Sequence, residues 1–204
     1  MRTKQPKLLD KPSESIDDQV SITTVQIAVL EQCPAFQKQV NTLIEDIHSD
    51  NSVRAAEGIK DIALLLQRNQ TFWTHAKVYT LYRYRDEADQ AMNHIIAEER
   101  AKFTSDSYTS QFGKVQYANT VDSSNVDASE PGHVWIITLV VGLEYSQVPG
   151  GNAQSREDLY GLLTWIRSLN SETIPACSIS FMPDVGPALG QDEFVEKYPD
   201  LMIV

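Results

Sequence analysis

The chain has very few cysteines. Cys33 and Cys177 are the only two in 204 residues, and they match neither a disulfide framework nor a zinc ligand set. Such cysteine usage is typical of a reducing compartment. We therefore predict two free, buried thiols. A single disulfide is the alternative, and it requires strands that bring the two residues together.

Long hydrophobic runs are also missing. No window reaches the roughly 18 apolar residues of a membrane helix, and the N-terminus has no apolar stretch of the kind that signal peptides carry. We predict a soluble, cytoplasmic protein without a transmembrane segment. Residues 1–19 are polar and include two prolines, which predicts a flexible N-terminal arm, and residues 20–204 are predicted to form a single domain.

Basic residues are scarce relative to acidic ones. The sequence has 17 Lys and Arg against 28 Asp and Glu, a formal net charge of −11, and its pI is near 4.7. A chain this acidic is repelled by phosphate backbones unless its few basic residues cluster. Nucleic acid is therefore not expected as a partner.

Recognisable catalytic motifs are absent as well. The sequence contains no glycine-rich phosphate loop, no HExxH zinc helix and no GxSxG nucleophile elbow. His94 and Glu98 lie one turn apart and indicate an exposed helix pair, whereas the adjacent Glu98 and Glu99 point apart on a helix and indicate solvated side chains. We predict no catalytic, cofactor-binding or metal-binding residues, and a non-enzymatic protein is favoured over an enzyme.

What the sequence does contain is a set of strong strand and helix patterns. Residues 133–145, HVWIITLVVGLEY, are the most apolar stretch and are rich in β-branched residues, which predicts a buried central strand. Further strands are predicted at 20–30, 71–84 and 176–183. Helical spacing of apolar residues predicts helices at about 34–47, 53–68, 86–104, 156–170 and 192–198.

The order of these elements indicates an α+β fold. We predict a mixed or antiparallel sheet of about four main strands with helices mostly on one face, in a ferredoxin-like arrangement. The two halves of the chain share their order of elements, which suggests a weak internal duplication. Residues 105–132, rich in Ser, Asp, Asn, Thr and Gly, are predicted to form an irregular connection.

One segment combines aromatic and basic residues at a predicted strand. Tyr, Trp and Arg are the residue types that anchor protein interfaces, so this run is a candidate interaction surface. The same residues also suit a half-exposed sheet face with no partner. The predicted surface consists of Trp73, Lys77, Tyr79, Tyr82, Arg83 and Arg85.

Five segments carry a resemblance to a known family. They are SITTVQIAVLEQ, NQTFWTHAKVY, AEERAKF, HVWIITLVVGLE and the C-terminal EKYPDLMIV. In this order and spacing, the chain from about residue 20 to 204 resembles the domain-of-unknown-function family fifteen-seventeen of cyanobacteria and chloroplasts, relatives of the plant fluctuating-light acclimation protein. The resemblance implies a photosynthetic setting and brings no catalytic residues.

The chain departs from longer members of that family. Those members carry a hydrophobic anchor and a low-complexity segment before the domain, whereas here a short polar arm precedes it. We therefore expect a cytoplasmic location, with peripheral membrane association as the alternative.

Two functional hypotheses follow. The first is a non-enzymatic interaction or regulatory module, linked to photosynthetic acclimation, that binds a protein partner through a sheet face or helix surface. The second is a small-ligand sensor or an unrecognised enzyme with a pocket between the helices and the sheet. The sequence does not indicate the oligomeric state.

Overall fold

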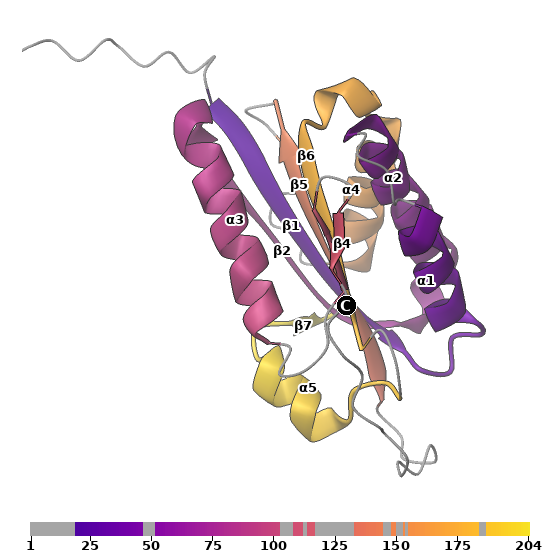
Figure 1. The fold of residues 1–204 in the computed structure, drawn as a ribbon. Coiled ribbons are helices and arrows are strands. Elements are labelled where there is room, and N and C mark those ends of the chain that lie inside the picture. Colours follow the sequence, from indigo (N-terminus) through magenta and orange to yellow (C-terminus); the bar gives the residue numbers. More distant parts are fainter. Residues whose placement is uncertain are drawn as a thin grey trace, which may run out of the picture.

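A computed structural model describes residues 19–46, 52–102, 108–111, 114–116, 133–144, 148–149, 153, 155–183 and 187–204. The predicted N-terminal arm, apart from Gln19, and most of the predicted irregular connection lie outside these residues. The described part is an α+β fold with one sheet, as predicted (Figure 1).

The sheet has seven strands in the order β4-β3-β6-β5-β1-β2-β7, and every neighbouring pair is antiparallel. Four strands are long and correspond to the four predicted ones, so the sheet is larger than predicted by three short strands. The long strands are β1 (Gln19–Leu30), β2 (Trp73–Tyr84), β5 (Val134–Leu143) and β6 (Ala176–Met182), and the short ones are β3 (Tyr108–Gln111), β4 (Lys114–Gln116) and β7 (Met202–Ile203).

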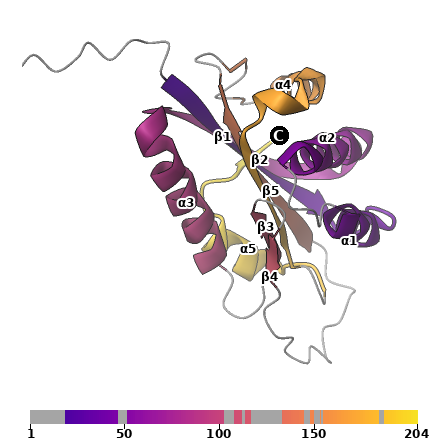
Figure 2. The ribbon, with the colours of Figure 1, turned by 45° about the horizontal axis from the view of Figure 1, so that its top comes forward.

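Helices cover both faces of the sheet, which corrects the prediction that they lie mostly on one face (Figures 1 and 2). Three of them, α1 (Phe36–Asp46), α2 (Ser52–Arg68) and α4 (Arg156–Ser168), share one core with the sheet. The other two, α3 (Arg85–Ala101) and α5 (Gln191–Lys197), pack on the opposite face. We call these the three-helix face and the two-helix face. The reason is visible in β5, where all ten residues are buried, because a strand buried on both sides must be covered on both sides.

The strand order does not match the predicted ferredoxin-like arrangement. In a split βαβ unit another strand separates the two strands that flank a helix, whereas β1 and β2 pair directly over most of their length. The observed order β6-β5-β1-β2 is instead symmetric about the central β1–β5 pair. This symmetry matches the shared element order of the two halves, and the internal duplication itself stays a prediction.

The two faces of the sheet differ in polarity. Because side chains alternate along a strand, the residues of β1 divide between the faces. Val25, Ile27 and Val29 belong to the core of the three-helix face. Gln26 and Thr138, which are Cα partners across β1 and β5, point to the two-helix face and are buried there. Most of the buried polar side chains of the strands lie on the two-helix face, whereas Ser21 and Thr23 are buried on the three-helix face.

Two local predictions are confirmed, those for the thiols and for the His94–Glu98 pair, and α4 has a side-chain N-cap. The Ser155 side chain caps α4 by accepting a hydrogen bond of 3.1 Å from the backbone N–H of Asp158. Cys33 and Cys177 are both free and buried. His94 and Glu98 form the expected exposed pair, with 3.3 Å between His94 Nε2 and Glu98 Oε1.

Candidate functional site

Most of the predicted interaction surface lies on β2 from residue 77 onward. Tyr82 is 42% exposed and Arg83 is exposed beside it. Lys77 pairs with Asp200 at 3.0 Å and also lies 5.4 Å above the Tyr79 ring. These four residues, Lys77, Tyr79, Tyr82 and Arg83, are called the β2 strip below. Tyr82 lies on the three-helix face and the other three lie on the two-helix face, so the strip includes residues of both faces.

The two ends of the predicted surface are placed differently. Trp73 is 2% exposed and lies in the core of the three-helix face, so its ring is not available to a partner. Arg85 is the first residue of α3, where its guanidinium pairs with Glu144 at 3.0 Å. This contact joins two residues that are 59 positions apart in the chain.

The β2 strip borders an open stretch of sheet edge. The last strand, β7, pairs with β2 at His75 and Ala76. Beyond that point no strand in the described part of the chain pairs with the outer side of β2. Residues 77–84 of β2 therefore form an edge, and Met202 and Ile203 of β7 are themselves 67% and 80% exposed.

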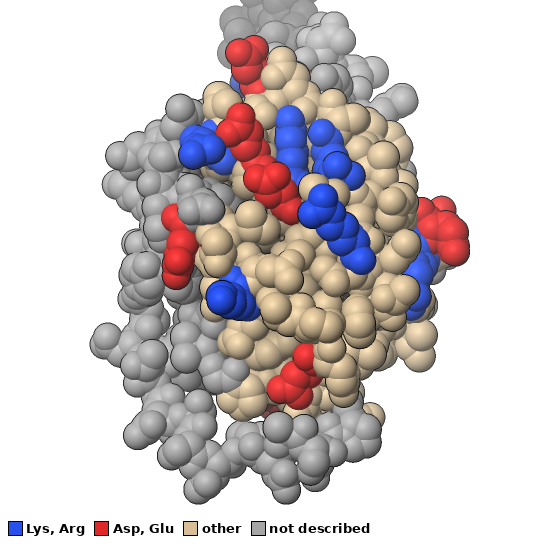
Figure 3. Space-filling view, turned by 90° about the vertical axis from the view of Figure 1, so that its right-hand side faces the viewer, with Lys and Arg blue, Asp and Glu red and all other residues tan. Residues whose placement is uncertain are grey.

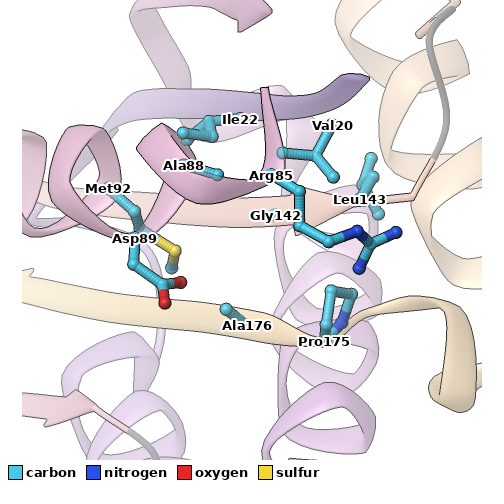
Figure 4. Close-up of a pocket in the computed structure, with 10 residues that line it drawn as sticks. All are labelled: Val20, Ile22, Arg85, Ala88, Asp89, Met92, Gly142, Leu143, Pro175 and Ala176. Atoms are coloured by element: carbon cyan, nitrogen blue, oxygen red, sulfur yellow. The ribbon is translucent and has the colours of Figure 1, made fainter. Parts of the chain in front are cut away.

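A pocket of about 300 Å³ lies between α3 and the two-helix face. Its walls are mostly apolar, and two charged side chains, Arg85 and Asp89, reach toward it from the first turns of α3 (Figure 4). This is the kind of pocket, between helix and sheet, that the second hypothesis predicts. The apolar lining residues are Val20, Ile22, Ala88, Met92, Gly142, Leu143, Pro175 and Ala176.

Further along α3, the carboxylate of Glu99 is buried against the sheet. Glu99 Oε2 accepts a 2.9 Å hydrogen bond from Gln26 Nε2, and Oε1 lies 2.7 Å from Lys102 Nζ. The Thr138 hydroxyl lies 3.4 Å from the same Oε2. Sequence reasoning treated Glu98 and Glu99 alike as solvated, and this is wrong for Glu99, which is 5% exposed. The missed signal is its spacing from Met92, Ile95 and Ile96, which share the inward face of α3.

Burial and the negative charge of Glu99 raise the pKa values of two tyrosines, Tyr79 and Tyr198. Burial raises the pKa of Tyr79 above its usual range, and the negative charges of Glu99 and Glu98 raise it further. The same two effects, burial and then Glu99, raise the pKa of Tyr198. Lys102 lies 4.5 Å above the Tyr198 ring. A phenol of ordinary pKa is already neutral at physiological pH, so these raised pKa values leave the charge of both tyrosines unchanged there.

The described residues offer little for covalent or metal chemistry. Burial raises the pKa of the Cys33 thiol to about 11 and that of Cys177 to about 12, so neither is an activated nucleophile. Within the described ranges no group of three or more His, Cys, Asp or Glu side chains could hold a metal ion. No helix among these residues has the length and apolar character needed to cross a membrane.

Charge on the three-helix side is mixed. Figure 3 shows Lys and Arg side chains gathered beside a line of Asp and Glu, with large uncharged areas around them. Interspersed charges of both signs give a weak net field. The described residues of this side do not form a continuous basic surface of the kind that binds nucleic acid.

Comparisons with known proteins agree with the resemblance noted in the sequence. Protein FLAP1 homolog A of Synechocystis is 21% identical to this chain over 197 residues, which is 93% of the chain and 59% of that protein. The chain thus spans less than two thirds of the length of the curated relative it matches. No solved structure matches the chain. The model of the family described as "Protein of unknown function (DUF1517)" matches residues 19–204. Because this match includes all the helices and strands described above, the chain belongs to the DUF1517 family.

Proposed function

We propose that this domain is a non-enzymatic interaction or regulatory module that works through protein partners in photosynthetic acclimation. The observation that carries the proposal is the β2 strip, in which the exposed Tyr82 and Arg83 and the half-buried Lys77 and Tyr79 lie beside an open sheet edge. Tyr and Arg anchor protein interfaces because each offers a large contact area together with a polar group.

The setting is suggested by the relative in Synechocystis, a cyanobacterium, whose name marks it as a FLAP1 homolog. Proteins related to the fluctuating-light acclimation protein are associated with adjustment to changing light. Since the chain covers part of that relative, the physiological role is a proposal for this domain and not a transfer of the relative's whole function.

Affinity capture from a cyanobacterial lysate tests the proposal. The full chain should enrich a protein in stoichiometric amount, and the double variant Tyr82→Ala/Arg83→Ala should lose it. The control is Tyr160→Ala/Arg54→Ala on α4 and α2, because Tyr160 is 40% exposed and closely matches Tyr82. If no protein is enriched under steady or fluctuating light, or if both double variants behave alike, the proposal is wrong.

The pocket beside α3 favours a second candidate function, a small-ligand sensor. Apolar walls with two charged groups near them would suit a small amphiphilic molecule. A ligand that binds the native state alone must raise the melting temperature, so a thermal-shift screen of nucleotides, tetrapyrroles and metals identifies it.

A variant on α3 assigns any hit to this pocket. Ala88→Leu places extra atoms in the pocket, whereas Ala97→Leu makes the same change at an exposed position of the same helix. The sensor hypothesis expects Ala88→Leu to abolish the shift and Ala97→Leu to keep it. A shift that survives Ala88→Leu would place the ligand elsewhere.

A further inference from the structure

The direction of the β2 backbone groups can be derived from two hydrogen bonds. The N–H of Glu31 donates to the carbonyl of His133 at 3.0 Å, so odd-numbered residues of β1 turn their backbone groups toward β5. Even-numbered residues of β1 then face β2, where Gln26 pairs with Lys77 and Thr24 with Tyr79. Odd-numbered residues of β2 consequently bond to β1.

The pairing of β2 with β7 leads independently to the same direction of the β2 backbone groups. The N–H of Val204 donates to the carbonyl of Thr74 at 3.1 Å, which places even-numbered residues of β2 on the outer side. Beyond the end of β7, the N–H and C=O groups of Val78, Thr80 and Tyr82 therefore point outward. Among the described residues no strand pairs with these groups. An open row of strand N–H and C=O groups is a template for another strand.

One of these outward groups is held by a side chain. The guanidinium of Arg83 donates to the carbonyl of Tyr82 at 2.8 Å. Charged side chains at an edge are a common guard against unwanted strand pairing. An acidic side chain on an incoming strand would attract Arg83 away from this carbonyl and leave it free to accept a backbone N–H, so charge recognition and strand pairing would be coupled.

The side chains along the open edge of β2 determine which sequence an added strand would need. Lys77 and Arg83 lie on the two-helix face, and Lys77 already attracts one carboxylate, that of Asp200. The even-numbered positions carry Val78, Thr80 and Tyr82 on the other face. A matching strand has acidic residues opposite Lys77 and Arg83, and apolar or β-branched residues at the alternate positions.

A second copy of this chain fits less well. The antiparallel register that pairs Val78, Thr80 and Tyr82 with the same three residues of another copy is centred on Thr80. This register places Lys77 of each copy opposite Arg83 of the other, and like charges directly opposite each other destabilise a strand pair.

We infer that the free edge of β2 binds an extended segment of a protein partner by strand addition, and that the segment alternates acidic with apolar residues. This rests on the proposed function and specifies its partner's chemistry. Main-chain hydrogen bonds to Val78, Thr80 and Tyr82 supply affinity, and the charges of Lys77 and Arg83 supply selectivity.

Synthetic peptides test the inference on the full chain. The probes are a blocked peptide of alternating Glu and Val, the same peptide with Lys for Glu, and the Glu peptide with N-methylated valines. NMR should show amide shifts along β2 with the Glu peptide, and about tenfold weaker binding for the other two. In Lys77→Glu/Arg83→Glu the preference should invert, so that the Lys peptide binds better, whereas Lys38→Glu/Arg54→Glu on α1 and α2 should keep it.

The opposite results overturn the inference. It is wrong if the Glu peptide leaves the β2 amides unchanged, if N-methylation has no effect, or if the free chain dimerises through β2, since a second copy would then be the occupant. Thr80→Pro distinguishes this failure from failure of the proposed function, because proline removes an outward N–H and leaves the β1 ladder intact. Thr80→Val is its control for the lost hydroxyl.

In lysate capture, strand addition expects Thr80→Pro to lose the partner and Thr80→Val to keep it. A partner that Thr80→Pro retains but Tyr82→Ala/Arg83→Ala loses would support the interaction module and refute strand addition.

Discussion

Replacing Glu99 with methionine removes the centre of the polar network on the two-helix face. Methionine has nearly the helix propensity of glutamate, so α3 itself is little affected. The amide of Gln26, which is 2% exposed, loses its 2.9 Å acceptor. Leaving such a group unsatisfied costs about 1–3 kcal/mol. The pair with Lys102 is partly exposed and contributes about 1 kcal/mol or less.

The expected loss is therefore about 3 kcal/mol in the free energy of unfolding, which lowers the melting temperature by roughly 6–12 °C. Urea unfolding followed by circular dichroism measures it. Replacing both hydrogen-bonding partners with apolar groups is nearly neutral, so Gln26→Met/Glu99→Met should be more stable than the sum of the single losses predicts. The control is Glu98→Met, an exposed neighbour that should change stability by about 0.5 kcal/mol or less.

Two outcomes would refute this reasoning. One is a Glu99→Met variant as stable as the wild-type chain, which would mean that the buried carboxylate is as costly as its hydrogen bonds are favourable. The other is a double variant whose loss equals the sum of the single losses, since residues in direct contact should show a coupling energy.

Three further predictions concern other parts of the fold. Burial lowers the pKa of His75 below 6.5, so the native state binds fewer protons than the unfolded state and stability should fall as the pH drops below about 6.5; His75→Gln should flatten the melting temperature between about pH 5 and pH 7, and an unchanged slope would contradict this. Because the thiol pKa values of Cys33 and Cys177 are raised to about 11 and about 12, a disulfide reagent at about pH 8 should label them slowly until the chain unfolds, and fast labelling of the native protein would be inconsistent with their burial. Ser155→Ala should cost about 1 kcal/mol and lower the melting temperature by about 2–4 °C through loss of the α4 cap, whereas Ser155→Asp should keep the stability; equal losses in both would show that the hydrogen bond to the Asp158 N–H contributes nothing.

The sequence was most informative where the signal was local and strong. The apolar run at 133–145 predicts a buried central strand, and β5 is buried at every residue. The same run also predicts that both faces of the sheet are covered there, because a strand with one solvent-exposed face would alternate apolar with polar residues. The prediction of helices mostly on one face is wrong because both faces of β5 are buried and need helices over them.

Local sequence patterns do not predict contacts between segments that are distant in the chain. The pair of Arg85 with Glu144 joins the start of α3 to the residue after β5, and no spacing rule predicts it. The burial of Trp73 depends on the core that α1, α2 and α4 build over the three-helix face. By contrast, Glu99 could have been separated from Glu98 by its place in the apolar stripe of α3.

The open edge of β2 can be measured directly on the free, full chain by amide hydrogen exchange at single-residue resolution. Backbone amides of Tyr79 and Leu81 donate to β1 and should be strongly protected, whereas those of Val78, Thr80 and Tyr82 should exchange close to the rate of an unstructured chain. An alternating pattern is the predicted result. Uniform protection across all five amides would mean that the edge is already covered, and would contradict the interaction surface proposed for β2.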